Sequence, residues 1–376
     1  MLKEAYAQRP LVSVVLATFN EADHVRRCMD SLLAQDTPHF DIEILAVDGG
    51  STDSTREYLN EIAAKHPRVR VVFNQKRRAP FAFNIGIREA RGQYLCIFGS
   101  HTIYKKDYIS VCLQELIDKS AAGCGGRVLT EPSSDNLQAR LVAYAMAHAF
   151  GSSGRSFRTQ PEGFAGAVNY MILKRDALFE AGGYSEVLLR NQDNDLNQKL
   201  RANGHRLFCT WKTQCTYHPK ETIRGLFRYG YRNGFWNVVS LKENSTSMGL
   251  HHFVPFFFVV FLFASFLLSA AGLLSPNSSF RFLAFSFPAL LILHLGAGML
   301  AALQVLVRKR FVGALCLPVV FAGFHFAYGL GTLVAFATGA KVPTTSPSSP
   351  STVREVRRAR ESTGVLASES RQEKSF

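Results

Sequence analysis

Residues 253–274, FVPFFFVVFLFASFLLSAAGLL, contain no charged side chain over 22 positions. A helix of this length can cross a hydrocarbon layer about 30 Å thick. Two further apolar runs follow, at about 282–306 and about 311–338. Residues 1–250 have no such run and lack the apolar core of a signal peptide. We therefore expect a soluble cytoplasmic domain tethered by a C-terminal transmembrane region; the alternative is that one or two runs are buried core helices.

The net charge of +14 suits an anionic partner such as nucleic acid, anionic lipid or a phosphorylated substrate. The chain has neither zinc-finger spacing nor an aromatic RNA-binding signature, so we expect no nucleic-acid partner. Charges beside the apolar runs point instead to membrane lipid headgroups. The seven cysteines form no Cys-x-x-Cys pair, which indicates a reducing compartment without a disulfide framework or structural zinc.

The first part of the chain alternates short apolar runs with helical patterns. The runs cover 11–17, 42–47, 69–73 and 94–98. Runs that are apolar throughout and separated by helices predict a parallel sheet covered on both faces. Ligands of such sheets bind beyond the carboxyl ends of the strands. This rule marks three candidate segments: Ala17–Glu21, Asp48–Asp53 and Gly99–His101.

Residues 47–55, VDGGSTDST, predict a strand end, a Gly-Gly turn and the start of a helix. Asp48 ends the strand, where its carboxylate can accept hydrogen bonds from a nucleotide's base or ribose. The alternative is that Asp48 caps the turn. Asp53 falls in the first turn of the helix, where it either serves a ligand or complements the helix dipole.

Five segments resemble the family 2 glycosyltransferases in their order and spacing. They are VSVVLATFNEADHVRRCMDSLL (12–33), ILAVDGGSTDST (44–55), AFNIGIREARGQYLCIF (82–98), GFAGAVNYMILKRDALFEAGGYSE (163–186) and NQDNDLNQKLRANGHRL (191–207). The resemblance covers roughly residues 11–240, and the apolar runs narrow it toward enzymes similar to succinoglycan-type exopolysaccharide glucosyltransferases. It implies an α/β GT-A fold with a mainly parallel sheet that binds a nucleotide-sugar and inverts the anomeric carbon.

The resemblance also implies site residues. Those at the nucleotide-sugar are Ala17, Phe19, Glu21, Asp48, Arg78, Asn84 and Ser100. The family's Glu-Asp pair falls on Gln192 and Asp193, which makes Asp193 the general base that takes the acceptor's proton. Gln192 can still orient an acceptor through its amide. The alternative for Asp193 is that it caps the following helix.

The family's Asp-x-Asp or Asp-x-His segment falls on Gly99-Ser100-His101, so the first aspartate is missing. His101 remains as the side-chain metal ligand that the resemblance implies, and imidazole suits Mn²⁺ better than Mg²⁺. The expectation is a weakly held Mn²⁺ whose other ligands are diphosphate and water. Two alternatives stay open: stabilisation without a metal, assisted by Arg77 or Arg78, and an inactive relative.

Arg224, Arg228 and Arg232 are spaced at i, i+4 and i+8, which places them on one stripe of a helix. Aromatic residues occupy adjacent faces: Phe227, Tyr231, Phe235 and Trp236. Basic and aromatic faces together predict an interfacial helix on anionic headgroups. A sharper hypothesis is that the arginines and Trp236 serve a polyprenyl-diphosphate-linked acceptor; the alternative is a solvated charged face.

The predicted organisation is a GT-A domain over 1–220, an amphipathic interfacial region over 221–250, a transmembrane region over 251–340 and a disordered tail over 341–376. With the GT-A domain in the cytoplasm, the basic residues 308–310 fit a cytoplasmic loop. We expect a multi-pass protein of the cell inner membrane or plasma membrane. Three spans are favoured, and a re-entrant third run is the alternative.

The leading functional prediction is an inverting transferase that moves a sugar, glucose-type, from a UDP-sugar to a lipid-linked glycan in exopolysaccharide or cell-surface glycan synthesis. An alternative is a catalytically weak or inactive scaffold subunit, suggested by Gly99 and Gln192. A processive polysaccharide synthase would carry a Gln-x-x-Arg-Trp segment after the base, whereas this chain has RNGFWN at 232–237.

Overall fold

The computed structural model describes residues 9–219, 221–275 and 277–341. Within these, the chain forms two compact units. Unit 1 takes in 9–127 and 162–215, and unit 2 takes in 128–161 and 216–341. The predicted disordered tail lies outside the described residues beyond Lys341.

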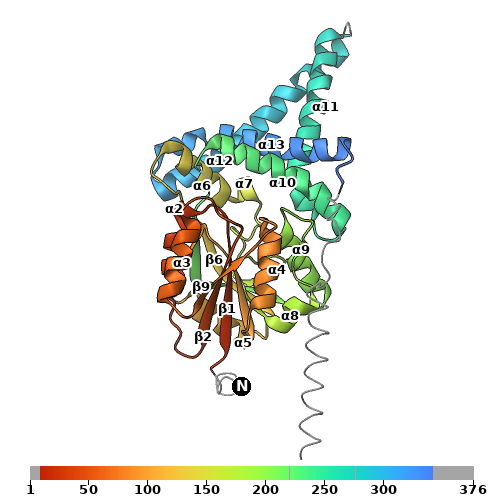
Figure 1. Ribbon diagram of the computed structural model, residues 1–376. Coiled ribbons are helices and arrows are strands. Elements are labelled where there is room, and N and C mark those ends of the chain that lie inside the picture. Colours follow the sequence, from red (N-terminus) through yellow and green to blue (C-terminus); the bar gives the residue numbers. More distant parts are fainter. Residues whose placement is uncertain (1–8, 220, 276, 342–376) are drawn as a thin grey trace, which may run out of the picture. The chain divides into compact units, whose positions relative to one another are not determined.

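Unit 1 is built on a mixed sheet with helices on both sides, α2 and α3 on one and α4 on the other (Figure 1). The strands are β1 (Leu11–Thr18), β2 (Asp41–Asp48), β3 (Val69–Phe73), β4 (Tyr94–Gly99), β5 (Thr102–Tyr104), β6 (Gly123–Thr130), β7 (Gly163–Phe164), β8 (Ile172–Lys174) and β9 (Leu207–Tyr217). The helices are α2 (Ala22–Leu33), α3 (Thr55–Lys65), α4 (Ala79–Glu89), α5 (Tyr108–Asp118), α8 (Arg175–Glu180) and α9 (Gln192–Ala202). Neighbouring strands follow the order β3-β2-β1-β4-β8-β6-β9-β5, and β7 pairs with β9.

The parallel part of the sheet confirms the prediction from the apolar runs. β1 pairs in parallel with β2 and with β4, and β2 pairs in parallel with β3. In β1, the side chains of Val12 and Val14–Leu16 are fully buried, as expected for a strand covered on both faces. β8 pairs antiparallel with β4 and β6, which makes the sheet mixed.

Unit 2 joins two short helices from the middle of the chain to the C-terminal helices. Its elements are α6 (Leu137–Ala147), α7 (Ala149–Ser152), α10 (Ile223–Glu243), α11 (Val254–Leu274), α12 (Ser286–Lys309), α13 (Leu317–Ala337) and the 3₁₀ segments Leu250–Phe253, Ser278–Phe285 and Val312–Cys316. One hydrophobic cluster includes Leu141 and Tyr144 of α6, Leu226 of α10 and Phe321 of α13. The segment 128–161 therefore groups with the C-terminal helices, although the sequence-based domain division placed it before residue 220.

α10 and α13 run side by side in unit 2 (Figure 1). Their backbones approach so closely that a Cβ on Gly234 would lie 1.9 Å from the carbonyl oxygen of Tyr328. The same holds for Gly331, where a Cβ would lie 2.0 Å from the carbonyl oxygen of Tyr231. Thr332 Oγ1 also donates to the carbonyl oxygen of Gly234 at 3.0 Å. Small residues permit this kind of close helix packing.

The three predicted apolar runs are helical, and each is long and apolar enough to cross a membrane. The candidate spans are Leu250–Leu274, Ser279–Lys309 and Val312–Ala337. In α11, Phe261, Phe266 and Leu267 are more than half exposed, which a buried core helix would not permit. α13 is a continuous helix of 21 residues, about 31 Å long at 1.5 Å per residue.

All seven cysteines are free thiols, and six of them are buried. Cys316 is the exposed one, at the end of the 3₁₀ segment that precedes α13. Burial raises the pKa of the Cys28, Cys96 and Cys112 thiols above their usual range, so these side chains pack as apolar groups.

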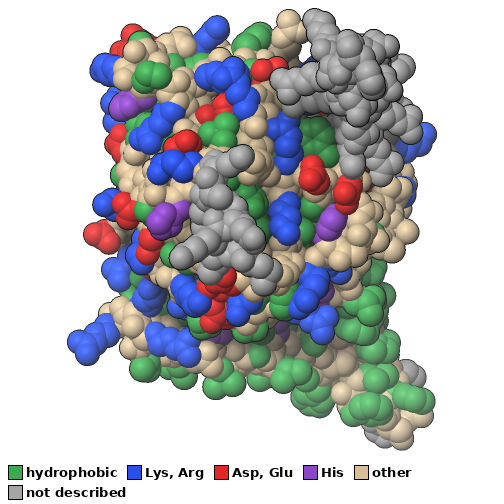
Figure 2. Space-filling model, turned by 90° about the horizontal axis from the view of Figure 1, so that it is seen from below, with side chains coloured by type: hydrophobic (Ala, Val, Ile, Leu, Met, Phe, Trp, Pro, Cys, Tyr) green, Lys and Arg blue, Asp and Glu red, His purple; other side chains and the backbone are tan. Residues whose placement is uncertain are grey.

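The basic charge of the chain is spread out on the face shown in Figure 2. Lysine and arginine side chains are interspersed there with aspartate and glutamate. Where this face shows described residues, they form no single-sign patch of the kind that binds a polyanion.

Candidate active site

The predicted site segments meet at one edge of the sheet in unit 1. Thr18 of β1 lies opposite Asp48 of β2, and Ala17 lies opposite Gly99 of β4. Neighbouring strands are about 4.8 Å apart, so the loops that follow these three strands are neighbours. The sheet therefore brings together the three segments that the sequence marked.

The loops after β1 and β2 are joined by hydrogen bonds. Asn20 Oδ1 accepts from the Thr52 amide at 2.8 Å, and the Asn20 amide donates to Ser51 Oγ at 2.9 Å. Asp53 Oδ2 accepts from the Ala22 amide at 3.2 Å. These bonds tie the two loops to each other.

Asp53 also accepts from the Thr55 amide at 3.0 Å, at the start of α3. Its hydrogen bonds, chiefly those with Thr55, lower the pKa of the Asp53 carboxyl below its usual value. Both oxygens of Asp53 thus accept backbone hydrogen bonds, which gives it a structural role at the helix start and between the loops.

Asp48 caps the turn that follows its strand. Its carboxylate accepts from the amides of Gly50 and Ser51 at 3.0 and 3.1 Å and from Ser51 Oγ at 2.5 Å. The side chain is only 1% exposed. The turn-capping alternative is therefore what the structure shows, and Asp48 can influence a ligand through the turn 49–51.

Phe19, Phe73 and Arg77 are exposed groups beside this turn. The Phe19 ring is 42% exposed, and a Cβ on Gly49 would lie 3.1 Å from one of its carbons. Arg78 is exposed at the N-cap of α4, and Ala17 is partly buried. An exposed ring can stack on a nucleobase, and a guanidinium can bind phosphate oxygens.

Asn84 departs from its predicted place. It is buried in α4, where its amide nitrogen donates to the carbonyl oxygen of Tyr184 at 2.9 Å and to Glu186 Oε1 at 3.0 Å. Its amide oxygen accepts from the Tyr184 backbone amide at 2.9 Å. Both ends of the Asn84 amide are engaged inside unit 1, so it fixes the segment around Tyr184 in place of contacting a nucleotide.

Tyr184 connects this segment to Asp193. Burial, together with the hydrogen-bonded Asp193 carboxylate, raises the pKa of Tyr184 well above its ordinary value, so the phenol stays protonated. Asn169 Nδ2 also donates to Asp193 Oδ2, at 3.3 Å. Asp193 lies in the first turn of α9 and is partly exposed, as is Gln192. Two neutral donors thus orient a carboxylate that can still receive a proton.

Asp195, two residues further along α9, has a different environment. It is fully buried, and its Oδ2 forms an ion pair with Lys199 Nζ at 2.6 Å, one helical turn away. This agrees with the prediction that Asp195 is a residue of the first helical turn. Of the two carboxylates, only Asp193 is placed to meet a substrate.

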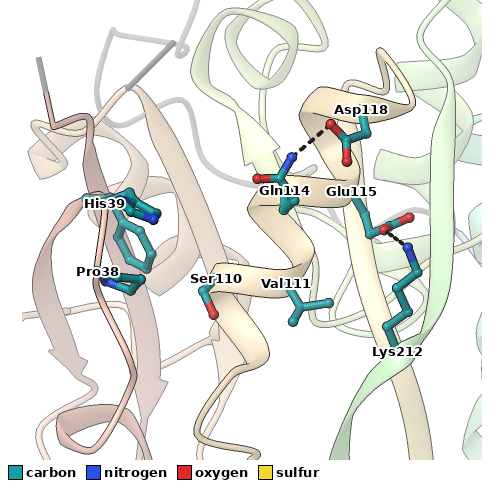
Figure 3. A pocket seen from close by; sticks show the side chains of 9 residues that line it. Pro38, His39, Ser110, Val111, Gln114, Glu115, Asp118 and Lys212 are labelled. Carbon is teal, nitrogen blue, oxygen red and sulfur yellow. Dashed lines mark hydrogen bonds and ion pairs between the residues drawn. The ribbon is translucent and has the colours of Figure 1, made fainter. Parts of the chain in front are cut away.

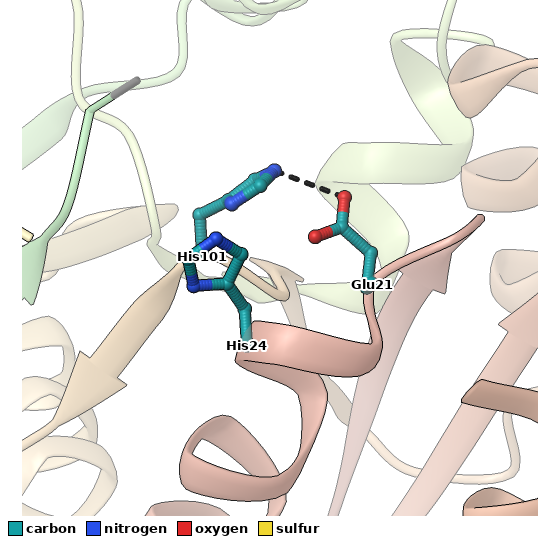
Figure 4. Close-up of side chains that lie close together, drawn as sticks. All are labelled: Glu21, His24 and His101. Carbon is teal, nitrogen blue, oxygen red and sulfur yellow. Dashed lines mark ion pairs between the residues drawn. The ribbon is translucent and has the colours of Figure 1, made fainter. Parts of the chain in front are cut away.

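The loop after β4 holds the candidate metal ligands. Ser100 is buried, whereas His101 is partly exposed and its Nε2 lies 2.9 Å from Glu21 Oε1 (Figure 4). A Cβ on Gly99 would meet only a ring carbon of Tyr170, at 3.6 Å. Packing therefore leaves room for a larger residue at position 99, and it does not explain the glycine there.

His24 is a neighbour of this pair that the sequence did not mark. It lies in the first turn of α2, and its ring centroid is 4.6 Å from that of His101. One ligand atom each from Glu21, His24 and His101 lie within 4.8 Å of one another. The Glu-x-x-His spacing at a helix start was the available signal, since residues three apart share a helix face.

A separate cavity of about 330 Å³ lies elsewhere in unit 1 (Figure 3). It is lined by Pro38, His39, Phe40, Ser110, Val111, Gln114, Glu115, Asp118 and Lys212. The buried Glu115 forms an ion pair with Lys212, which raises the pKa of the lysine. None of the predicted site residues lines this cavity, so it is distinct from the candidate active site.

The fold and the strand-end site define a GT-A-like glycosyltransferase domain. Residues 13–180 match the model of glycosyl transferase family 2, which places this part of the chain in that family. The solved mannosyltransferase PcManGT from Pyrobaculum calidifontis, in complex with GDP-Man and Mn²⁺, superposes with a TM-score of 0.55 at 18% identity, over 87% of this chain and 88% of that one. This likeness supports the fold.

The match to two curated relatives spans most of the length of each relative. The succinoglycan biosynthesis protein ExoA of Rhizobium meliloti (strain 1021) is 29% identical over 246 residues, which is 64% of this chain and 73% of the relative. A dolichyl N-acetyl-alpha-D-glucosaminyl phosphate 3-beta-D-2,3-diacetamido-2,3-dideoxy-beta-D-glucuronosyltransferase of Methanococcus voltae is 28% identical over 254 residues, or 61% of this chain and 77% of the relative.

Proposed function

We propose that this family 2 glycosyltransferase is an inverting enzyme that moves a sugar from a UDP-sugar, glucose-type, to a lipid-linked glycan. The observation that carries the proposal is the partly exposed Asp193 carboxylate, oriented by Asn169 and Tyr184. Inverting transfer needs one carboxylate to take the acceptor hydroxyl's proton as the oxygen attacks the anomeric carbon. Asp193 fills that role, and Gln192 orients the acceptor beside it.

The donor is assigned to the three strand-end loops. Phe19 offers its exposed ring to the base, the turn held by Asp48 places its backbone beside that ring, and Arg78 offers a guanidinium to the diphosphate. A bound Mn²⁺ would stabilise the charge that develops on the departing diphosphate. The His101 imidazole next to the Glu21 carboxylate is a donor set that suits this ion.

The acceptor is assigned to a membrane. The name of the Methanococcus relative describes a dolichyl-phosphate-linked substrate, and α11 to α13 carry the apolar length that anchors a chain in a bilayer. We place the catalytic unit in the cytoplasm, the chain in the cell inner or plasma membrane with three spans, and 308–310 in a cytoplasmic loop.

Hydrolysis and transfer assays test the proposal. Purified full-length protein is incubated with a panel of UDP-, GDP- and dTDP-sugars, with Mn²⁺ or with chelator, and free nucleotide is measured. A single UDP-hexose should be turned over, and faster when a polyprenyl-diphosphate glycan is added. Absence of turnover with every donor and acceptor would favour the inactive scaffold, which Gly99 and Gln192 suggest.

Asp48→Ala is expected to weaken UDP binding about tenfold and to lower the melting temperature. Three donors of the turn lose their acceptor, and unsatisfied buried donors cost about 1–3 kcal/mol. Calorimetry with UDP and thermal denaturation measure the two effects. Asp41→Ala, at the other end of β2, is the matched control because its ion pair with Arg9 is exposed. Lower stability with unchanged UDP affinity would separate this turn from the donor site.

Replacing Arg224, Arg228 and Arg232 with Gln is expected to raise the Michaelis constant for the lipid acceptor about 10- to 100-fold. All three are exposed on α10, and each arginine near an anionic surface contributes on the order of 1 kcal/mol. The effect should shrink as salt rises, and UDP affinity should not change. The half-buried Phe227 and Trp236 keep their places in both forms.

The control for this stripe replaces three exposed cations of unit 1, Lys65, Lys119 and Arg201, with Gln. It removes the same charge from the protein without touching α10. The Michaelis constant for the lipid acceptor is measured for both variants with the acceptor in vesicles of defined anionic lipid content. An equal rise of this Michaelis constant in both variants would mean that net charge alone causes the effect. A loss of UDP affinity in the stripe variant would assign the arginines to the UDP-sugar site.

A further inference from the structure

We infer that Glu21, His24 and His101 form a three-ligand site that binds a first-row transition-metal ion before any nucleotide arrives. The inference deepens the proposed function, on which it rests for the metal's use but not for its binding. It replaces a single histidine ligand with a site made by two elements, the start of α2 and the loop after β4.

The geometry fits one ion. With bonds of about 2.1 Å, adjacent ligand atoms on a metal lie about 3.0–3.4 Å apart, depending on the coordination angle. Glu21 Oε1 and His101 Nε2 are 2.9 Å apart, and the third ligand atom lies within 4.8 Å. The His24 ring, whose centroid lies 4.6 Å from that of His101, would supply the third ligand by moving closer to the pair (Figure 4).

The backbone holds two of the ligands on one face. The carbonyl oxygen of Glu21 accepts from the amides of His24 and Val25 at 2.9 and 2.8 Å, and these bonds form the first turn of α2. The Glu21 amide donates to Thr55 Oγ1 at 2.8 Å, which ties this turn to the next loop. The Glu-x-x-His spacing on a helix is used in carboxylate-bridged metal proteins for the same geometric reason.

The ligand types select the metal. Mg²⁺ demands oxygen ligands and keeps several waters, whereas two imidazoles and one carboxylate suit Mn²⁺, Fe²⁺, Co²⁺ or Zn²⁺. Three ligands on one side leave positions open for diphosphate oxygens or water. Gly99 supplies no ligand. Because Glu21 and His24 add two protein ligands to His101, the ion can bind without the nucleotide-sugar.

Metal titration without nucleotide tests the inference. Full-length protein in detergent is stripped with chelator, dialysed and titrated with Co²⁺, followed by its visible absorption, and with Mn²⁺, followed by the loss of the free-ion EPR signal. The wild type should bind about one equivalent, and a tenfold excess of Mg²⁺ should not displace it. Even outer-shell partners are worth about 10- to 100-fold in metal affinity, so His24→Ala should lose at least about 100-fold.

His39→Ala is the matched control, since His39 is an exposed histidine of the separate cavity. Glu21→Gln, which keeps the side-chain shape, serves if His24→Ala does not fold. Equal Co²⁺ affinity in the His24 and His39 variants, or binding that requires UDP, would overturn the inference. Transfer is read separately. Metal bound through His24 without sugar transfer refutes only the proposed function, and transfer in chelator without metal binding refutes only this site.

Discussion

Asp193→Asn is expected to lower the turnover number about 10²- to 10⁴-fold, the usual contribution of a general base, while UDP affinity stays unchanged. Asparagine keeps the shape of the side chain but cannot take the acceptor's proton. Asn169 and Tyr184 both donate to this carboxylate. In the variant they face an amide that has only one oxygen acceptor, because its other end is an NH₂ donor. Steady-state transfer to a lipid-linked acceptor and UDP calorimetry measure the two quantities.

Asp195→Asn is the control on the same helical turn. It removes a carboxylate two residues away, and because Asp195 is fully buried in its ion pair with Lys199, it should cost folding stability more than turnover. Near-normal transfer by Asp193→Asn, or an equal loss of turnover in both variants at matched folding, would remove Asp193 from the base role.

Gly234→Ala is expected to destabilise unit 2 by about 3 kcal/mol or more, the upper part of the range for overpacking. The added Cβ would lie 1.9 Å from a backbone oxygen and 2.9 Å from Thr332 Oγ1. Since the oxygen belongs to the backbone of α13, no side-chain rotation relieves the overlap, and α10 must move away. Thermal denaturation of the full-length protein in one detergent measures the effect.

Gly296→Ala supplies the comparison. Gly296 lies within α12, and a Cβ there would meet nothing within 4 Å. Alanine is favoured over glycine in helices by about 1 kcal/mol, so this variant should melt at the same temperature or slightly higher. If both variants melted alike, the contact between α10 and α13 would not limit the stability of unit 2.

The sequence predicted the parallel strands because their signal is local. Each of β1 to β4 is a mainly apolar run bounded by polar residues, and the rule about strand ends then placed Asp48 and Gly99 at the same edge of the sheet, on either side of β1. None of the strands β5 to β9 was predicted. β7 and β8 are two and three residues long, too short to show a pattern, and β6, GCGGRVLT, begins with small residues and not with an apolar run.

Roles that depend on distant partners were harder to predict. Asn84 contacts Tyr184, one hundred residues away, and nothing near Asn84 in the chain indicates this. His24 becomes a candidate ligand only because the loop with His101 lies against the start of α2. Similarly, α6 is apolar on most of its surface, so its periodicity could not tell which helices it packs against.

The single exposed thiol gives the native chain a built-in reporter. Cys316 follows the basic segment 308–310, at the turn between α12 and α13, while the other six thiols are buried. Cys316 lies near the start of the candidate span Val312–Ala337, so it is the one site in the unmodified protein that a membrane-impermeant maleimide can reach where this turn meets water. Labelling of intact cells compared with inverted vesicles reads out which side of the bilayer this turn occupies, and no cysteine-free background has to be engineered first.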